Sequence, residues 1–299
     1  MREYDNETLS KVQQLELMIL RDSLALCKRH GLQMFGIAGT AIGAIRHGGF
    51  IPWDDDIDVA LMRKDYDLFI KYVKEELGAK YIVMNAQEDS NYPLMTTRLM
   101  LKGTKFREEA LQDIDCYLGI FLDIYVLDYL ADDEKAFKKQ CRDAFLISKL
   151  QILRSIPLPV LPFRGVKAKL AHVITWCAHY VLVIFCVSKK KLYQCGDSIA
   201  RRFDDHTDAK RVGFLFDTFP YLNIYETEDI FPLRPITYNG IPFAIPCHVE
   251  KKLTEMYGDF MTMPPVEKRK NHFPFELDFG QYTDISTEDI SLGKCDWQK

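Results

Sequence analysis

Apolar residues recur at helical spacing in some stretches of this chain and at alternate positions in others. Residues 8–30 carry apolar side chains three or four residues apart and are followed by Gly31, which predicts a helix with one buried face. Residues 65–78 repeat this pattern. Shorter apolar runs with the character of strands lie at residues 32–38, 57–62, 81–85, 96–101 and 119–126. Helices that alternate with strands predict an α/β (α+β) fold, a mixed sheet flanked by helices.

The second half of the chain predicts further helices and one hairpin. A helix is expected over residues 132–153 and another over residues 249–257, where Gly258 would end it. Residues 231–246 are expected to form a β-hairpin, because Asn239-Gly240 is a favoured two-residue turn between apolar strands.

Three parts are expected along the chain. Residues 1–130 would form the core, and a mainly helical insertion would follow at residues 131–215, where Pro157, Pro159 and Pro162 interrupt regular structure. Residues 216–299 would contribute a hairpin and a helix that complete the core.

The most apolar run of the chain is residues 170–187. It contains His172 and His179 and is marginal for a membrane-spanning helix, which needs about 20 apolar residues. Two interpretations stay open, a helix buried in the core and a helix lying in the plane of a membrane surface. Aromatic and basic residues typical of membrane interfaces lie within or beside the run: Trp176, Tyr180, Arg164, Lys167, Lys169 and Lys189 to Lys191. We expect peripheral membrane contact through residues 157–191.

Charge and cysteine content limit the partners and the cellular compartment expected for this protein. The net charge of −4 gives no electrostatic footprint for nucleic acid as a partner, although it does not exclude a single nucleotide. The eight cysteines are scattered and form no Cys-x-x-Cys pair, so buried free thiols are expected, Cys27 and Cys177 among them. A long chain without a disulfide framework or an apolar leader is expected in the cytoplasm, on the inner face of the cell membrane.

Candidate chemistry centres on four aspartates within residues 54–58. If a strand begins near Ile57, Asp56 and Asp58 project from the same face, where they could bridge oxygen-liganded metal ions, with Asp54 behind them. A calcium-binding loop is excluded, because Val59 replaces its glycine and Asp65 its final glutamate. A solvated turn before a strand is the alternative.

A possible phosphate site lies upstream of these aspartates. The strand expected at residues 32–38 runs into Gly39-Thr40, and a helix is expected from Ala41 to His47. Free backbone N–H groups at the start of a helix, together with its dipole, suit a phosphate group. Gly39 and Thr40 are therefore candidate phosphate contacts.

The run from Gly39 to Val59 resembles the signature of the LicD family, to which fukutin and fukutin-related protein are also similar. The resemblance places Gly39-Thr40 at the turn of a nucleotidyltransferase-like fold, and Asp56 and Asp58 at its metal-binding pair. Asp123, in residues 119–128, matches the third carboxylate. A Tyr-Gly-Asp…Pro-Pro…His pattern near the C-terminus, including His272, extends the similarity to about residues 30–275.

The resemblance implies an enzyme that transfers phosphocholine from CDP-choline to a hydroxyl of a cell-surface glycan precursor, such as teichoic acid, lipopolysaccharide or capsule. It implies that Asp56, Asp58 and Asp123 hold Mg²⁺ (or Mn²⁺), with Asp123 also orienting or deprotonating the acceptor. The acceptor could be lipid-linked. Alternatives are transfer of glycerol-phosphate or ribitol-phosphate, nucleotidyl transfer, and an inactive protein that binds a nucleotide or glycan.

Five further residues are candidate substrate contacts, each with a structural alternative. Arg46 and His47 could contact donor phosphate or acceptor sugar, or Arg46 could pair with an aspartate. Trp53 could stack on a base or on choline, or simply pack. Arg98 could reach the donor, and His272 the acceptor, or both could be surface residues.

Overall fold

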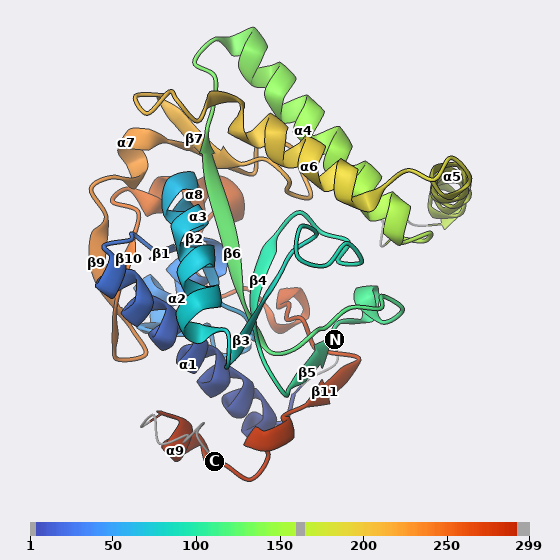
Figure 1. The fold of residues 1–299 in the computed structure, drawn as a ribbon. Helices are drawn as coiled ribbons and strands as arrows, with labels where there is room; N and C mark the ends of the chain where they lie inside the picture. The colour runs from blue at the N-terminus through green and yellow to red at the C-terminus, as the bar shows by residue number, and fades with distance from the viewer. Residues whose placement is uncertain (1–3, 160–164, 292–299) are drawn as a thin grey trace.

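In a computed structural model, which describes residues 4–159 and 165–291, seven strands form one mixed sheet with helices packed around it (Figure 1). This confirms the predicted fold class. The strands follow the spatial order β1 (Phe35–Gly36), β2 (Asp58–Met62), β6 (Phe121–Tyr129), β4 (Thr97–Leu101) and β3 (Tyr81–Met84). β7 (Arg211–Phe214) pairs with the far end of β6, and β8 (Asn223–Glu226) pairs with β7.

β6 is the central strand, and its alternating side chains divide the sheet into two different faces. β2 lies parallel to β6, while β4 and β7 lie antiparallel to it. One face is apolar and belongs to the main core, to which β2 and its flank contribute Ile57, Val59 and Leu61 and β6 contributes Leu122, Ile124 and Val126. The opposite face carries Asp58 and Asp123, which are register partners. The period of two therefore places the carboxylates on the face away from the main core.

Side chains of helix α1 (Asn6–His30) pack against the apolar face of the sheet and form much of the main core. Asp5 caps its start by accepting a hydrogen bond from the Thr8 N–H, and Gly31 ends it in the left-handed conformation at φ 67°. α3 (Arg63–Tyr72) is continued by a π-helical turn, Val73–Leu77. Both helices confirm predictions from apolar spacing, within a few residues at their ends.

The predicted strand at residues 32–38 is wrong in length. Only Phe35 and Gly36 pair with β2, and α2 (Ala38–His47) begins at once. Ala38 has φ 46°, so the chain turns sharply there instead of extending. Gly39 and Thr40 consequently lie in the first turn of α2 and not in a loop before it.

The predicted hairpin is confirmed. β9 (Arg234–Tyr238) and β10 (Ile241–Ile245) are joined by Asn239 and Gly240, both at positive φ. The Asn239 side chain accepts a hydrogen bond from the Phe50 N–H at 2.9 Å, which fixes the loop that leads to the aspartates. α8 (Val249–Tyr257) follows and ends at Gly258, as expected.

The remaining elements surround this core. β5 (Lys105–Arg107) and β11 (Glu276–Asp278) form a separate two-stranded sheet. α4 (Glu134–Ser155) and α6 (Lys189–Ala200) pack side by side. The short segments are η2 (Glu109–Leu111), η3 (Arg201–Phe203), α7 (Thr227–Ile230), η4 (Val266–Lys268), η5 (Gly280–Tyr282) and α9 (Thr287–Ser291). Between residues 131 and 215 the chain thus adds strand β7 to the sheet as well as helices.

The apolar run forms helix α5 (Gly165–Ile184), and the interpretation of this run as a buried core helix is wrong. It lies at the edge of the molecule (Figure 1, far right), and none of its residues is buried, so it is not a core helix. Cys177 is exposed for the same reason, whereas Cys27 is buried as expected. Residues 160–164, with Pro162 and Arg164, lie outside the described residues.

Within the described part of the chain, no helix alone has the length and apolar composition needed to cross a membrane. α5 meets that test only together with residues 189–203, and the two helices are bent by 105° relative to each other.

Candidate active site

Three carboxyl groups converge where β2 and β6 begin. Asp56 precedes β2, Asp58 is its first residue and Asp123 lies near the start of β6. One oxygen atom from each lies within 4.8 Å of the others. The structure thus brings together the three residues expected to hold a metal ion, from segments more than sixty residues apart in sequence.

Two backbone contacts fix this convergence. The Asp123 N–H donates to the carbonyl of Ile57 at 3.0 Å, which locks the register that sets Asp58 opposite Asp123. The Asp58 N–H donates to the Thr40 hydroxyl oxygen at 2.7 Å, and Thr40 is buried. Thr40 therefore ties the first turn of α2 to the first residue of β2.

Burial and mutual repulsion make these carboxyl groups hard to ionise. Burial raises the pKa of Asp56 to about 6, although the nearby His272 opposes the shift. Burial, and then the charges of Asp56 and Asp123, raise the pKa of Asp58 well above its usual range. The pKa of Asp54 is raised in the same way, by burial and then by Asp56 and Asp58. A cation in the site would favour the ionised form of Asp54 and Asp58.

Arg98 supplies one positive charge. It is buried on β4, and its guanidinium donates to Asp123 at 2.9 Å and to Glu108 at 2.5 Å. The Phe121 ring lies beneath it, 3.8 Å from the guanidinium carbon to the ring centroid. Burial raises the pKa of Asp123, and Arg98 opposes this. Arg98 is thus neither a surface residue nor free to move, and it holds Asp123 in place.

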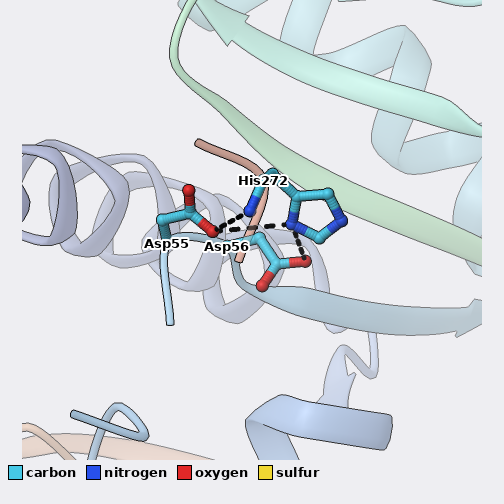
Figure 2. A group of neighbouring side chains, drawn as sticks. All are labelled: Asp55, Asp56 and His272. Atoms are coloured by element: carbon cyan, nitrogen blue, oxygen red, sulfur yellow. Dashed lines mark hydrogen bonds and ion pairs between the residues drawn. The ribbon is translucent and has the colours of Figure 1, made fainter. Parts of the chain in front are cut away.

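His272 supplies the second positive charge (Figure 2). Its backbone N–H donates to Asp55 at 2.7 Å, and its Nδ1 lies 3.5 Å from Asp55 and 3.4 Å from Asp56. Partial burial alone would lower the pKa of His272, but the hydrogen bond to Asp55 and the charges of Asp56 and Asp55 raise it to about 10. The imidazole is therefore cationic at neutral pH, and its side chain remains 44% exposed.

Glu16 lies behind the cluster, on the buried face of α1. Neither of its carboxyl oxygens has a hydrogen-bond partner among the described residues, and its side chain is fully buried. Burial, followed by the charges of Asp55 and Asp56, raises the pKa of Glu16 well above its usual range, which favours its neutral form. The Tyr4 hydroxyl donates to Asp55 at 2.7 Å from the other side.

The other candidate contacts are Gly39, Arg46, His47 and Trp53. Gly39 is in the first turn of α2, where an added Cβ would lie 3.2 Å from Asp54 Oδ2. Arg46 and His47 lie at the opposite end of the helix, where Arg46 donates to the Phe260 carbonyl and to His47 Nε2. The Arg269 guanidinium lies over the Trp53 ring, 4.2 Å from its centroid.

Glu16 and Glu108 were not identified from the sequence. Glu16 follows Val12 by four residues, so it occupies the apolar stripe of its helix, and a carboxylate there was a usable signal. Glu108 carried no comparable signal, because its role depends on the approach of Arg98 from β4.

An open cavity of about 700 Å³ lies elsewhere, between α3 and α6. It lies toward the other end of β2, where Arg63 is held by Asp128 at 2.6 Å and by Asp197 at 3.1 Å. Its cationic groups are already paired with carboxylates, so we assign the chemistry to the carboxylate cluster and not to this cavity.

Comparisons with known proteins agree with the motif. Residues 31–108 match the family LicD/FKTN/FKRP, nucleotidyltransferase domain. The chain is 29% identical over 271 residues to the lipopolysaccharide cholinephosphotransferase LicD of Haemophilus influenzae, covering 89% of this chain and 96% of that protein. Uncharacterised proteins of Rickettsia prowazekii and Rickettsia typhi are 36% identical over 47 residues, 16% of this chain.

Manganese binding should strengthen as pH rises. A carboxyl group must lose its proton to bind a metal ion, and Asp56 does so near pH 6. We expect the affinity for Mn²⁺ to increase by at least about fourfold between pH 5.5 and 7.5, as measured by isothermal titration calorimetry. Affinity that does not change with pH would contradict the electrostatics described for this cluster.

Removing one carboxylate should stabilise the metal-free protein. The raised pKa values mean that the folded state binds protons more tightly than the unfolded state, so stability falls as pH rises from about 4 through 6 and above. At pH 7.5 with chelator, we expect Asp58→Asn to raise the free energy of unfolding by roughly 1–3 kcal/mol, a few degrees in Tm.

The matched control for this measurement is Asp229→Asn. Asp229 is paired with Lys251 away from the cluster, so its loss should leave Tm unchanged or lower it. A lower Tm for Asp58→Asn in chelator would mean that the carboxylates do not repel one another strongly.

Proposed function

We propose that this chain, which carries a LicD-family nucleotidyltransferase domain at residues 31–108, is a phosphotransferase that moves phosphocholine from CDP-choline to a hydroxyl group of a lipopolysaccharide or similar cell-surface glycan precursor. The observation that carries this proposal is the convergence of Asp56, Asp58 and Asp123. The similarity to a cholinephosphotransferase along most of both chains supports phosphocholine as the transferred group.

The carboxylate cluster suits a hard divalent cation. All three donors are carboxylate oxygens, which Mg²⁺ and Mn²⁺ prefer, and burial, together with the neighbouring carboxylates, raises the pKa values of Asp56 and Asp58. Asp56, Asp58 and Asp123 would hold one or two such ions. A bound ion would neutralise charge on the donor diphosphate during transfer.

The surrounding residues would orient the reactants. The N–H groups in the first turn of α2, at Gly39 and Thr40, would bind donor phosphate, because the start of a helix favours an anion. Arg98 keeps Asp123 in one orientation. The half-exposed, cationic His272 would attract the acceptor or the donor phosphate from the opposite side.

The reaction would need no covalent enzyme intermediate. The acceptor hydroxyl would attack the phosphorus that carries choline, and its proton would pass to Asp123. The bond between that phosphorus and the oxygen bridging to CMP would break, so CMP would leave. Arg46, His47 and Trp53 remain candidate contacts for the parts of the donor and acceptor farther from the reacting phosphorus.

Incubation with CDP-choline, CDP-glycerol and CDP-ribitol in Mg²⁺ tests the proposal. We expect CMP release from CDP-choline when a glycan acceptor is present, and a loss of at least about a hundredfold in kcat for Asp58→Asn, because a metal ligand is removed. Asp229→Asn, a carboxylate substitution away from the site, should retain activity.

The other donors distinguish the alternatives. CMP release only from CDP-glycerol or CDP-ribitol would mean that another phospho-group is transferred. CMP release from none of the donors would favour an inactive binding protein. Full activity in Asp58→Asn would remove Asp58 from the mechanism.

Membrane contact through α5 is a further part of the proposed function. Residues 144–196 contain no aspartate or glutamate, in a chain whose net charge is −4. α5 and the residue after it expose large apolar side chains, such as Ile184 at 73% and Phe185 at 77%. Basic residues at both ends would face anionic headgroups while the apolar side chains enter the interface. The protein would then work at the inner face of the membrane, close to a lipid-linked acceptor.

The wild-type protein should co-sediment with vesicles containing phosphatidylglycerol and bind far less to pure phosphatidylcholine. Replacing Ile174 and Val181 with aspartate should weaken binding by about tenfold or more, since two apolar side chains leave the interface. Val266→Asp, an equally exposed valine elsewhere, is the control. Equal sedimentation of all three proteins, or self-association through α5 without vesicle binding, would contradict membrane contact.

A further inference from the structure

The cavity of about 700 Å³ between α3 and α6 has no part in the proposed reaction. Arg63, which lines it, directly follows Met62, and Met62 is at the end of β2 opposite Asp58. These two ends of the strand are about 13 Å apart at the usual rise per residue. The volume of the cavity lies in the range of pockets that hold small molecules. Its occupant would therefore be a group other than the one that reacts at the metal cluster.

Hydrogen bonds hold one wall of this cavity in a fixed position. The Tyr66 hydroxyl lies 2.7 Å from the Thr97 hydroxyl, and the Asn85 amide donates to both oxygens at 3.3 Å. The side-chain oxygen of Asn85 accepts hydrogen bonds from the backbone N–H groups of Gln87 and Glu88, each at 3.0 Å. Because Asn85 and Tyr66 are buried, the loop that carries Gln87 and Glu88 is anchored to the core.

The charged groups of the lining compensate one another. Arg201 donates to both oxygens of Asp67, at 2.7 and 2.8 Å, and Arg63 donates to Asp197 at 3.1 Å, so these pairs also join α3 to α6. The other lining charges are paired as well, Arg202 with Asp143 and Glu88 with Lys74. The described lining thus contains three arginines and three carboxylates, none without an ion pair. A charged ligand would have to compete with these pairs.

The uncharged polar groups of the lining are available to a ligand. Gln87, Gln194 and Ser198 are exposed, and Tyr193 is half-buried. Among the described residues, none forms a hydrogen bond with the side chains of Gln194 and Ser198, the side-chain amide of Gln87 or the hydroxyl of Tyr193. Ile70 is the single aliphatic residue in the described lining, so a lipid chain would find little apolar surface there.

We propose that this cavity binds a neutral sugar unit of the glycan acceptor. This inference rests on the proposed function for the source of the sugar. A sugar hydroxyl both donates and accepts hydrogen bonds, as do the amides of Gln87 and Gln194 and the hydroxyls of Tyr193 and Ser198. The Tyr193 ring adds an apolar surface against which the C–H groups of a sugar ring can pack.

A sugar bound here would anchor the acceptor without taking part in the transfer. The metal cluster lies at the start of β2 and the cavity beyond its end, so the anchored sugar and the reacting hydroxyl would belong to different parts of the glycan. The cavity residues would then change how tightly the acceptor binds and not how fast the bound acceptor reacts.

Saturation-transfer NMR on the full-length protein, without donor, tests the cavity. The probes are methyl glucoside, methyl galactoside and N-acetylglucosamine, with glucuronate as the charged comparison. We expect at least one neutral sugar to bind more tightly than glucuronate. Tyr193→Phe should weaken its binding by about fivefold, since one hydrogen bond is lost, and Ser198→Met by at least about fivefold, since a longer side chain enters the cavity. Thr254→Met, at an exposed position on α8 outside the cavity, is the matched control and should bind as wild type.

The transfer reaction tests whether the sugar belongs to the acceptor. With CDP-choline and a glycan acceptor, Ser198→Met should raise KM for the acceptor several-fold while kcat and KM for CDP-choline stay unchanged. A lower kcat with unchanged KM for the acceptor would contradict an anchoring role.

The outcomes separate this inference from the proposed function. No saturation transfer to any neutral sugar, tighter binding of glucuronate, or unchanged binding in both Tyr193→Phe and Ser198→Met would each refute the sugar site, whether or not CMP is released. Sugar binding that these two variants weaken, without CMP release from any donor, would support the cavity as a sugar site and refute the proposed function.

Discussion

Repulsion among closely spaced carboxylates is the constraint on which this structure depends. Asp54, Asp56 and Asp58, which are half-buried, approach the buried Asp123 at one end of the sheet, where like charges interact more strongly than in water. A fold optimised only for stability would not gather them. Their proximity is maintained by the register of β2 and β6, which the apolar residues on the opposite face of the same strands stabilise.

The surrounding residues reduce this repulsion without cancelling it. Arg98 compensates Asp123, and His272 compensates Asp55 and Asp56, but the pKa values of the cluster remain raised. Burial and these neighbouring charges raise the pKa of Glu16, behind the cluster, and so favour its neutral form. The remaining negative charge suits a divalent cation, so stability is lower where ligand binding needs charge, as is common at functional sites.

The family match covers only part of this arrangement. Residues 31–108 include Asp56, Asp58 and Arg98, whereas Asp123 and His272 lie beyond them. The similarity to the Haemophilus influenzae protein extends along most of the chain, which fits a site assembled from distant segments. α5 lies apart from this site at the edge of the molecule, so binding a surface and binding the donor would use different parts of the chain (Figure 1).

Local patterns in the sequence were sufficient for α1, α3, α4, α8 and the hairpin. Helical and strand periods act over a few residues, so α1, α8 and the Asn239-Gly240 turn follow from neighbouring residues alone. Asp123 was identified by resemblance to a family, because no local rule links it to Asp58.

Only the tertiary structure decided which distant groups meet. The early start of α2, the ion pairs of Arg98 and the placement of His272 beside Asp55 all depend on contacts between segments far apart in sequence. The exposure of α5 also depends on tertiary structure, because the composition of an apolar run does not reveal whether other segments cover it. Periodicity fixes which face of an element is apolar, but packing determines what that face contacts.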